Sequence, residues 1–309
     1  MRGADRGLLL GDGLFETILV RGGVPFRLDR HLARLRLAAG RTGMPLPFDL
    51  AGAVQDRIES GVGLPGEGLH GADRADVDPS GVDRSGADPS GSARSRVGAP
   101  RLTSTARARP EFAALRITAT RGPGDGLAPP TSPVGAMYLS YRSIERPPPS
   151  QRPGLSAMTV GRVDERSLTA GLKHTGYLER ILALKAARDV GLDEAVLQNS
   201  RGALVEGSAS NLFAVQSGTL LTPAVAEGAL PGITRQAILE LAELAGIPVE
   251  IRAPGPEEPV DELFLTSALR GPIPLVRLDE REFGPPGPIY LRLARELEAL
   301  IERETAPSS

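Results

Sequence analysis

Hydrophobic and polar positions in the first part of the chain follow the periods of a strand, a turn and a helix. Residues 14–20 are rich in β-branched and large apolar side chains, which predicts a strand. Residues 21–23 read Arg-Gly-Gly and predict a hairpin turn, with residues 24–28 returning as a second strand. A helix is then expected from an N-cap at Asp29 to about Gly40, with apolar positions at Leu32, Leu35 and Leu37.

Patterned segments resume after residue 112 and continue almost to the end of the chain. Alternating apolar and polar residues predict strands at 113–120 and 134–143. Between 177 and 190 the apolar residues recur at helical spacing, which predicts a helix that buries Leu178, Ile181, Leu182 and Ala186. The other elements expected here are a strand meander over 194–197, 203–206, 211–215 and 220–222, a helix at 234–245, a strand at 262–267 and a helix at 289–302.

Residues 62–110 differ from the rest of the chain in composition. Gly, Asp, Ser, Arg and Pro dominate, and Asp-Pro-Ser-Gly occurs at 78–81 and again at 88–91. Such a segment buries too little apolar surface to offset the entropy lost on ordering, so we expect a disordered low-complexity insert in a surface loop. A calcium loop is disfavoured, because the acidic spacing does not match an EF-hand and arginines are interspersed.

Composition then excludes several classes of function. The 309 residues are 40% hydrophobic and carry a net charge of −2, which gives no electrostatic basis for binding nucleic acid or an anionic membrane. The chain has no cysteine and three histidines, so disulfides are impossible and a metal site is not expected. No apolar run approaches the ~20 residues of a membrane span. We therefore expect a cytoplasmic protein.

Three motifs in the second half of the chain carry the groups that pyridoxal phosphate (PLP) requires. Gly171-Leu-Lys-His-Thr-Gly-Tyr177 supplies an amine, and Val205-Glu-Gly-Ser-Ala-Ser-Asn-Leu-Phe213 supplies a carboxylate. Leu230-Pro-Gly-Ile-Thr-Arg235 precedes a predicted helix. The amine can form a Schiff base with the aldehyde, the carboxylate can keep the pyridine nitrogen protonated, and a helix start can bind the phosphate.

Each motif taken alone has a more ordinary interpretation. A lysine before a helix is usually a solvated charge, a strand glutamate is usually a rim residue, and Gly-Ile-Thr is usually a turn with an N-cap. Other candidates for the amine and the carboxylate are Lys185 and Glu194. Lys185 lies in mid-helix between Arg180 and Arg188, which indicates a solvated face, and Glu194 begins a strand.

In this order and with these neighbours, the motifs resemble the class IV aminotransferase family, the fold-type IV PLP enzymes. The family includes branched-chain aminotransferases, D-amino acid aminotransferases and aminodeoxychorismate lyases, and the resemblance covers roughly residues 5–60 and 112–290. It implies an α/β (α+β) fold with a small N-terminal domain at 1–125, an interdomain loop at 126–134 and a large PLP-binding domain at 135–305. It also implies a homodimer, with PLP in the cleft between the domains.

The resemblance also implies a role for individual residues. Lys173 matches the lysine that binds PLP and moves the substrate proton, and Glu206 matches the carboxylate beside the pyridine nitrogen. The residues that match the phosphate site are Arg34, Gly232, Ile233, Thr234, Thr266 and Ser267, and either Thr266 or Ser267 could point inward. Family members usually have a strand and a turn before the position of Asp5-Arg-Gly7. We therefore expect either a start further upstream or a first sheet that lacks one edge strand.

Two residues are expected on the substrate side. Phe15 lies in the block Gly11-Asp-Gly-Leu-Phe-Glu-Thr17, which resembles the family's N-terminal motif. Arg121 follows the strand at 113–120 in an Arg-Gly pair similar to one in lyases and D-amino acid aminotransferases. Its guanidinium fork suits a substrate carboxylate, but a turn residue that caps the strand is an equally good interpretation.

Two reactions remain open. A lyase would convert 4-amino-4-deoxychorismate to 4-aminobenzoate and pyruvate, whereas an aminotransferase of branched-chain or D-amino acid type would move an amino group to a 2-keto acid. The same PLP residues serve both reactions. We favour the lyase, because the block at 11–17 and the segment at 264–270 look more like lyase relatives. The arginine-bearing motif expected of branched-chain enzymes is also not evident after 113–120.

Overall fold

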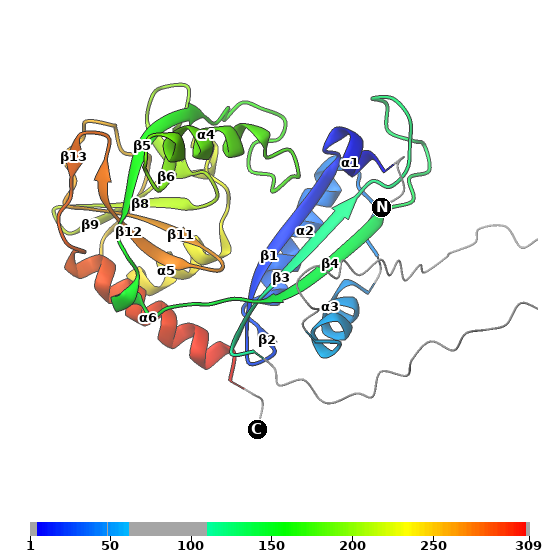
Figure 1. Ribbon diagram of the computed structural model, residues 1–309, viewed down its shortest axis with the longest axis horizontal. Coiled ribbons are helices and arrows are strands. Elements are labelled where there is room, and N and C mark those ends of the chain that lie inside the picture. Colours follow the sequence, from blue (N-terminus) through cyan, green and yellow to red (C-terminus); the bar gives the residue numbers. More distant parts are fainter. Residues whose placement is uncertain (1–4, 48, 62–109, 307–309) are drawn as a thin grey trace, which may run out of the picture.

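The computed structural model of the chain describes residues 5–47, 49–61 and 110–306. These residues form two β-sheets that lie side by side, each packed against helices, and this is the two-domain α/β architecture expected from the sequence (Figure 1). Apart from Pro110, the insert expected at 62–110 lies outside the described residues.

The smaller sheet is antiparallel and has the strand order β2-β1-β3-β4. Its long strands β1 and β3 pair along their whole length, from Gly13 opposite Thr120 to Arg21 opposite Phe112. Two helices cover one face, and the core between them and the sheet includes Leu14, Ile18 and Leu35. The elements of this half are α1 (Arg6–Leu10), β1 (Gly13–Arg21), β2 (Val24–Pro25), α2 (Leu28–Thr42), α3 (Leu50–Glu59), β3 (Phe112–Thr120) and β4 (Ala136–Ser143).

Helix α2 differs from its prediction at both ends. Its N-cap is Arg27, which has a positive φ of 52°, and Asp29 lies inside the first turn. The helix continues through Gly40 and ends at Gly43, where glycine adopts the left-handed conformation (φ 63°) with little strain. Leu37, expected on the apolar face, is exposed.

Strand β4 corrects the expected domain boundary. It pairs with β3 from Ala113 opposite Ser143 to Thr120 opposite Ala136, so residues 136–143 belong to the smaller sheet and not to the large domain. The segment at 126–134 is therefore the connection between two strands of one sheet. The chain crosses to the larger sheet between Ser143 and Leu155.

The larger sheet has nine strands, in the order β10-β9-β8-β11-β12-β5-β6-β7, with β13 paired to β12 and β7 also paired to β8. Helix α4 packs on β5 and β6, and α5 and α6 pack on β11. The strands are β5 (Leu155–Arg162), β6 (Glu194–Gln198), β7 (Leu204–Gly207), β8 (Asn211–Gln216), β9 (Thr219–Thr222), β10 (Val249–Ile251), β11 (Glu262–Ser267), β12 (Gly271–Leu278) and β13 (Arg281–Glu282). The helices are α4 (Leu178–Asp189), α5 (Ile233–Leu244) and α6 (Pro288–Glu304), with single 3₁₀ turns at Pro149–Gln151 and Val225–Glu227.

Helix α4 is correctly placed but faces the opposite way from the prediction. Leu178, Ile181 and Leu182 are 68%, 58% and 55% exposed, whereas Ala183 and Ala187 are buried against β6. Periodicity identified an apolar stripe, but small alanines on another face let the helix approach the sheet more closely. The apolar stripe is left on the surface of the single chain.

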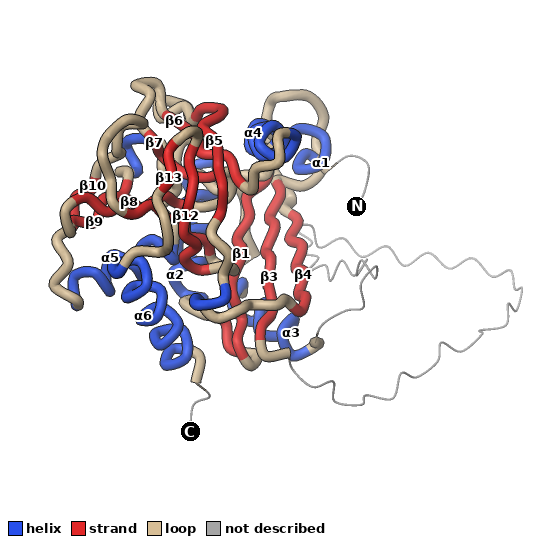
Figure 2. The backbone as a smooth tube through the Cα atoms, turned by 60° about the vertical axis from the view of Figure 1, so that its left-hand side comes forward, coloured by secondary structure: helices blue, strands red, loops and turns tan. Residues whose placement is uncertain are grey.

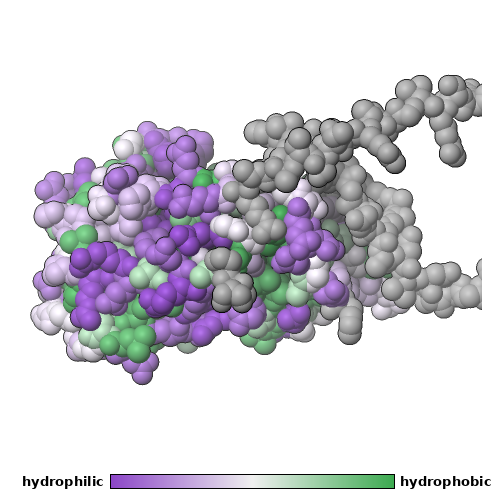
Figure 3. Space-filling view, turned by 90° about the horizontal axis from the view of Figure 1, so that it is seen from below, coloured by the Kyte–Doolittle hydropathy of each residue, from purple (hydrophilic) through white to green (hydrophobic). Residues whose placement is uncertain are grey.

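Apolar contacts and ion pairs join the two halves. Leu19 and Phe26 of the smaller sheet belong to one hydrophobic cluster with α5 and α6. Arg27 adds an ion pair to Glu240 on α5 at 2.7 Å and another to Glu304 on α6 at 3.1 Å. These contacts set how the two sheets meet, and therefore the shape of the cleft between them. On the side seen in Figure 3, hydrophilic side chains cover most of the described surface.

Within the described residues, every helix is too short or too polar to span a bilayer.

Candidate active site

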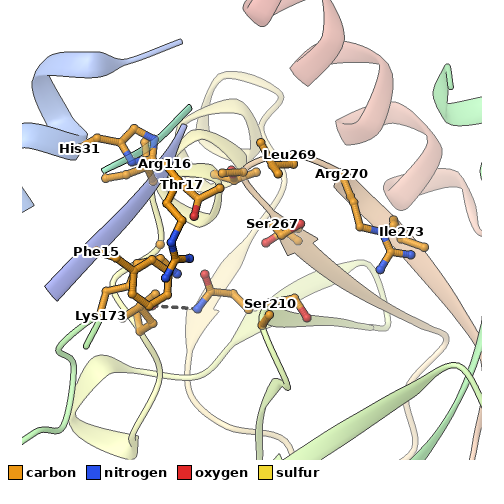
Figure 4. Close-up of a pocket in the computed structure, with 18 of the residues that line it drawn as sticks. Phe15, Thr17, His31, Arg116, Lys173, Ser210, Ser267, Leu269, Arg270 and Ile273 are labelled. Atoms are coloured by element: carbon orange, nitrogen blue, oxygen red, sulfur yellow. Dashed lines mark hydrogen bonds between the residues drawn. The ribbon is translucent and has the colours of Figure 1, made fainter. Parts of the chain in front are cut away.

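A cavity of about 800 Å³ lies between the two sheets. Figure 4 shows Phe15, Arg116 and Lys173 on one side of it, and Ser267, Arg270 and Ile273 on the other. Nine of the ten residues expected at the cofactor and substrate site line this cavity: Phe15, Arg34, Lys173, Glu206, Gly232, Ile233, Thr234, Thr266 and Ser267. Segments far apart in the sequence are therefore brought together as predicted, and the exception is Arg121.

The backbone of Lys173 is fixed to the smaller sheet. The Phe15 N–H donates to the Lys173 carbonyl at 2.9 Å, and the Thr175 N–H donates to the Gly13 carbonyl at 2.8 Å. The side chain crosses the Phe15 ring, with Nζ 4.5 Å from the ring centroid and 3.5 Å from the Tyr177 hydroxyl. The lysine thus has the rigid mount that a covalent catalyst needs.

The environment of Lys173 makes its amine a better nucleophile. Burial, reinforced by the positive charge of Arg34, lowers the pKa of Lys173 from 10.5 to about 8, against the opposing charges of Glu16 and Glu206. A larger fraction of the amine is therefore neutral near pH 7 than in a solvated lysine. Lys185 forms an exposed pair with Asp189, as the sequence indicated.

Glu206 lies on β7 and is 2% exposed. Its Oε2 accepts a hydrogen bond from the Leu230 N–H at 3.1 Å, and its Oε1 accepts one from Arg180 at 2.5 Å. On the adjacent strand, Asn211 pairs with Glu206 in register and donates to the Leu230 carbonyl at 2.8 Å. The carboxylate is thus fixed at the cavity wall by three neighbouring segments.

The start of α5 provides an anion site. Its N-cap Gly232 has no side-chain oxygen, so no side chain caps the first N–H groups of the helix, and they are available to an anion. A Cβ at Gly232 would lie 1.9 Å from the Asn211 Oδ1, which explains why glycine occupies this position. Arg34 reaches the same place by donating to the Pro231 carbonyl at 2.7 Å.

Thr266 adds a hydroxyl to this anion site. Its Oγ1 is buried and has no hydrogen-bond partner among the described residues. A buried polar atom without a partner costs free energy, so an acceptor from a bound ligand would satisfy it. Ser267 also lines the cavity but is only partly buried. Thr266 is therefore the better candidate for the inward-pointing hydroxyl, a choice that the sequence left open.

Glu16, to which the motifs assigned no role, holds Arg34 in place. Its two oxygens accept from the Arg34 Nε and Nη2, both at 2.7 Å, and Oε2 also lies 2.7 Å from the His31 Nδ1. Burial would raise the pKa of Glu16, but hydrogen bonds from His31 and Arg34 outweigh this and lower it to about 2. A signal was present, because Glu16 shares a strand face with the core residues Leu14 and Ile18.

Arg121 does not line the cavity of the single chain, so its expected role in substrate binding stays a prediction. Its guanidinium donates to Asp12 at 2.8 Å and to the carbonyls of Gly43 and Thr42, both at 2.9 Å. The fork thus ties the end of α2 to the turn before β1. The alternative interpretation of Arg121 as a turn residue is the one that its contacts match.

Arg116 lies on the cavity wall instead. It lies on β3, five residues before Arg121, and pairs with Thr17 of β1 in register. Its guanidinium lies 3.8 Å from the centroid of the Phe15 ring. Burial lowers the pKa of Arg116, but a guanidinium keeps its charge at physiological pH. Arg116 therefore presents a positive charge to the cavity close to Lys173.

A family model for amino-transferase class IV matches residues 13–63 and 100–278, well over half of the chain. The chain belongs to the class IV aminotransferases. It is 30% identical to a putative branched-chain-amino-acid aminotransferase of Methanocaldococcus jannaschii, over 90% of this chain and 82% of that protein. It is 27% identical to a D-alanine aminotransferase of Bacillus licheniformis, over 98% of this chain and 92% of that protein.

Solved structures agree with this assignment. The structure of 4-amino-4-deoxychorismate lyase from Pseudomonas aeruginosa is 28% identical, covers 98% of this chain and 94% of its own, and has a TM-score of 0.72. A branched-chain aminotransferase from Escherichia coli has a TM-score of 0.78 at 22% identity, which shows the shared fold. The relatives of this class IV aminotransferase thus include both a lyase and aminotransferases.

Enzymes of the class IV aminotransferase family depend on PLP, and PLP is the cofactor of this chain. The cavity fits that cofactor on three independent features. It has a nucleophilic amine at Lys173, a fixed carboxylate at Glu206 and an anion site at the start of α5.

The pairing of Glu16 with Arg34 and His31 predicts a pH-dependent contribution to stability. The pKa of Glu16 is about 2 in the folded protein, below its ordinary value of 4.5, so the folded state favours the ionised carboxylate. That stability is complete above about pH 4.5 and is lost as the pH falls towards 2. The difference in pKa corresponds to about 3 kcal/mol.

Glu16→Gln should therefore lower the free energy of unfolding by about 3 kcal/mol at pH 6 and by much less at pH 3. Urea denaturation of both proteins at several pH values measures this. Glu296→Gln, which removes an exposed i,i+4 pair with Arg292, is the matched control and should stay within about 0.5 kcal/mol. An equal loss from Glu16→Gln at pH 3 and pH 6 would contradict the assigned role of this carboxylate.

Proposed function

We propose that this class IV enzyme is an aminodeoxychorismate lyase, which converts 4-amino-4-deoxychorismate to 4-aminobenzoate and pyruvate. The observation that carries the proposal is the charge of the cavity wall. Among the described residues, Arg116, Arg142 and Arg270 line the cavity without a carboxylate partner. The other arginines of the wall are paired: Arg34 with Glu16, Arg180 with Glu206, and Arg146 and Arg152 with Glu298.

Cavity-lining arginines without a salt-bridge partner favour an anionic ligand, because their positive charge and N–H donors remain available to it. PLP brings one anionic phosphate, for which Arg34 and the start of α5 are already suited. 4-Amino-4-deoxychorismate brings two carboxylates, one on the ring and one on the enolpyruvyl group. A branched-chain amino acid or alanine has one carboxylate and a small apolar side chain, for which three further arginines are a poor match.

In this proposal the cavity residues divide between cofactor and substrate. Lys173 would attach the cofactor, Glu206 would pair with its pyridine nitrogen, and Arg34 with Thr266 and the N-terminus of α5 would hold its phosphate. At that N-terminus the contacts come from Gly232, Ile233 and Thr234, and Ser267 is adjacent. When bound, PLP supplies an electron sink for negative charge at the carbon that carries the substrate amine.

Lys173 performs the proton transfers. With the cofactor and substrate bound, its free amine would remove the proton from the amine-bearing carbon, and its pKa of about 8 suits a base that works near neutral pH. It then protonates the departing enolpyruvate. The Tyr177 hydroxyl lies 3.5 Å from the Lys173 Nζ and limits where the amine can lie. The Phe15 and Tyr177 rings, with centroids 5.1 Å apart, shield the amine from water.

The assay that separates the two reactions uses the purified protein saturated with PLP. We expect 4-aminobenzoate and pyruvate in equal amounts from 4-amino-4-deoxychorismate, with no 2-keto acid added as an amino acceptor. Arg116→Gln should lower kcat/KM for this substrate about ten- to a hundredfold, since a charged hydrogen bond contributes about 1.5–3 kcal/mol. Arg162→Gln, on the exposed end of β5, is the control and should match the parent.

The named relatives supply the competing hypothesis of an aminotransferase. Keto-acid-dependent transfer from a branched-chain amino acid or D-alanine, without any 4-aminobenzoate, would replace the lyase with that activity. Such a result would leave the assignment of the PLP residues intact, because both reactions use them.

We also propose that the enzyme works as a homodimer that buries the outer face of α4. Leu178, Ile181 and Leu182 form an exposed apolar stripe there, and such stripes mark interfaces more often than open surface. The Thr175 hydroxyl, just before α4, donates to the Gly11 carbonyl at the end of α1, where Leu8, Leu9 and Leu10 are also exposed. A second copy of the chain is the occupant that the family resemblance implies.

Ile181→Arg should convert the dimer to a monomer in light-scattering measurements, because it places a charge in the centre of the apolar stripe. Leu244→Arg is the matched control, since Leu244 is an isolated leucine on α5 that is 84% exposed. A parent protein that is monomeric, or an Ile181→Arg variant that stays dimeric, would contradict this interface.

The cytoplasmic location expected from the sequence also stays a prediction.

A further inference from the structure

Arg180 is a cavity residue that the sequence placed on a solvated helix face. It lies on the first turn of α4, three residues after Tyr177, so the two side chains share a face of the helix. Both line the cavity together with Lys173. The loop and helix that carry the reactive lysine therefore also bring a permanent cation to the same site.

The guanidinium of Arg180 is held on several sides. Its Nη2 donates to the Glu206 Oε1 at 2.5 Å, and its Nη1 lies 3.3 Å from the Ser208 carbonyl. Its central carbon is 5.5 Å from the centroid of the Tyr177 ring. Burial would lower the pKa of Arg180, but the Glu206 carboxylate outweighs this and raises it, so the side chain stays charged.

The Glu206 carboxylate is thereby held at both oxygens. Arg180 occupies one position on Oε1, and the Leu230 N–H occupies one position on Oε2. A carboxylate has about four acceptor positions, so about two remain free for a further donor. Glu206 therefore has a counter-charge within the chain itself, in the guanidinium of Arg180.

We propose that Arg180 is a positioning residue of the PLP site, which holds Glu206 ready for the pyridine nitrogen and supplies a fixed positive charge that faces Lys173. The inference rests on the proposed roles of Lys173 and Glu206 and adds a residue that acts through both. It does not depend on whether the enzyme is a lyase or an aminotransferase.

The effect of Arg180 on Lys173 has a definite sign. Arg34 and Arg180 lower the pKa of Lys173, and Glu16 and Glu206 raise it. Removal of Arg180 should therefore raise the pKa of the amine, removal of Glu206 should lower it, and removal of both should nearly cancel. The charged and titratable groups that surround this amine are Glu16 on β1, His31 and Arg34 on α2, Arg116 on β3, Tyr177 and Arg180 at α4, and Glu206 on β7.

The sequence makes a direct measurement possible, because Lys173 and Lys185 are its two lysines. In the full-length protein freed of cofactor, reductive methylation with ¹³C-formaldehyde labels both side chains, and a pH titration by NMR then reports each pKa. Lys185 is exposed and serves as the internal reference. The proteins to compare are the parent, Arg180→Gln, Glu206→Gln and the double variant, with Arg188→Gln as the exposed control on the same helix. Arg180→Lys is also compared, and its third labelled lysine is identified as the signal absent from the parent.

We expect the Lys173 midpoint to rise by about 0.5–1 pH unit in Arg180→Gln and to fall in Glu206→Gln. The double variant and Arg180→Lys should stay close to the parent, as should Arg188→Gln. At pH 7 the rate at which PLP is captured, followed by its absorbance, should fall about three- to tenfold in Arg180→Gln, in proportion to the neutral amine. The rate should recover when the pH is raised.

A Lys173 midpoint that does not move in Arg180→Gln, or that moves equally in Arg188→Gln, would overturn the proposal. A double variant with the same Lys173 pKa as Arg180→Gln would also overturn it, because removal of the Glu206 charge would then have no opposing effect on the amine. The double variant leaves neither partner of the pair buried and unpaired. Its Lys173 pKa can therefore still be measured if Arg180→Gln folds poorly. Failure of the lyase assay alone would leave these titrations unchanged, so the two failures are distinguishable.

Discussion

The site depends on the hydrogen bonds that bind the loop around Lys173 to strand β1. Phe15 and Thr175 donate to the carbonyls of Lys173 and Gly13, so the edge of the smaller sheet holds the loop that connects β5 to α4 in the larger domain. Strand β1 also carries Glu16, the partner of Arg34, and it pairs with β3 along its whole length. One strand therefore positions Lys173, Glu16 and, through β3, Arg116. Any change in how the sheets meet would move these groups together.

Electrostatics then divides the cavity into regions with different tasks. The Arg34 and Arg180 guanidinia are each matched by a buried glutamate, which fixes their positions. An intact pair of this kind gains little over an apolar pair of the same size, because desolvation offsets most of the attraction, but loss of one partner is costly because it leaves the other charge buried and uncompensated. Their benefit is preorganisation, since the charges are already in place when a ligand enters. Arg116, Arg142 and Arg270 lack such partners among the described residues, so their charge remains available to a substrate.

The sequence could predict the parts of the site that are local. Lys173, Glu206 and the start of α5 lie in short motifs, and their elements follow from apolar periodicity. Glu16 left a signal, since it shares a strand face with core residues, but the partners of Glu16 and Arg180 could not be predicted because they are distant in the sequence. The sequence alone also could not show that Arg116, and not Arg121, lines the cavity. That depends on the register in which β3 pairs with β1. For α4 the periodicity gave the apolar stripe but not the surface that covers it.

The most direct test of the account is to locate the covalently attached cofactor. The enzyme saturated with PLP is reduced with borohydride, digested and analysed by mass spectrometry, with Lys173 and Lys185 as the two side chains able to carry the adduct. We predict the mass of reduced PLP on the peptide that contains Lys173 and the unmodified mass for Lys185. An adduct on Lys185, or one that persists in Lys173→Ala, would contradict the central claim that Lys173 is the residue that binds the cofactor.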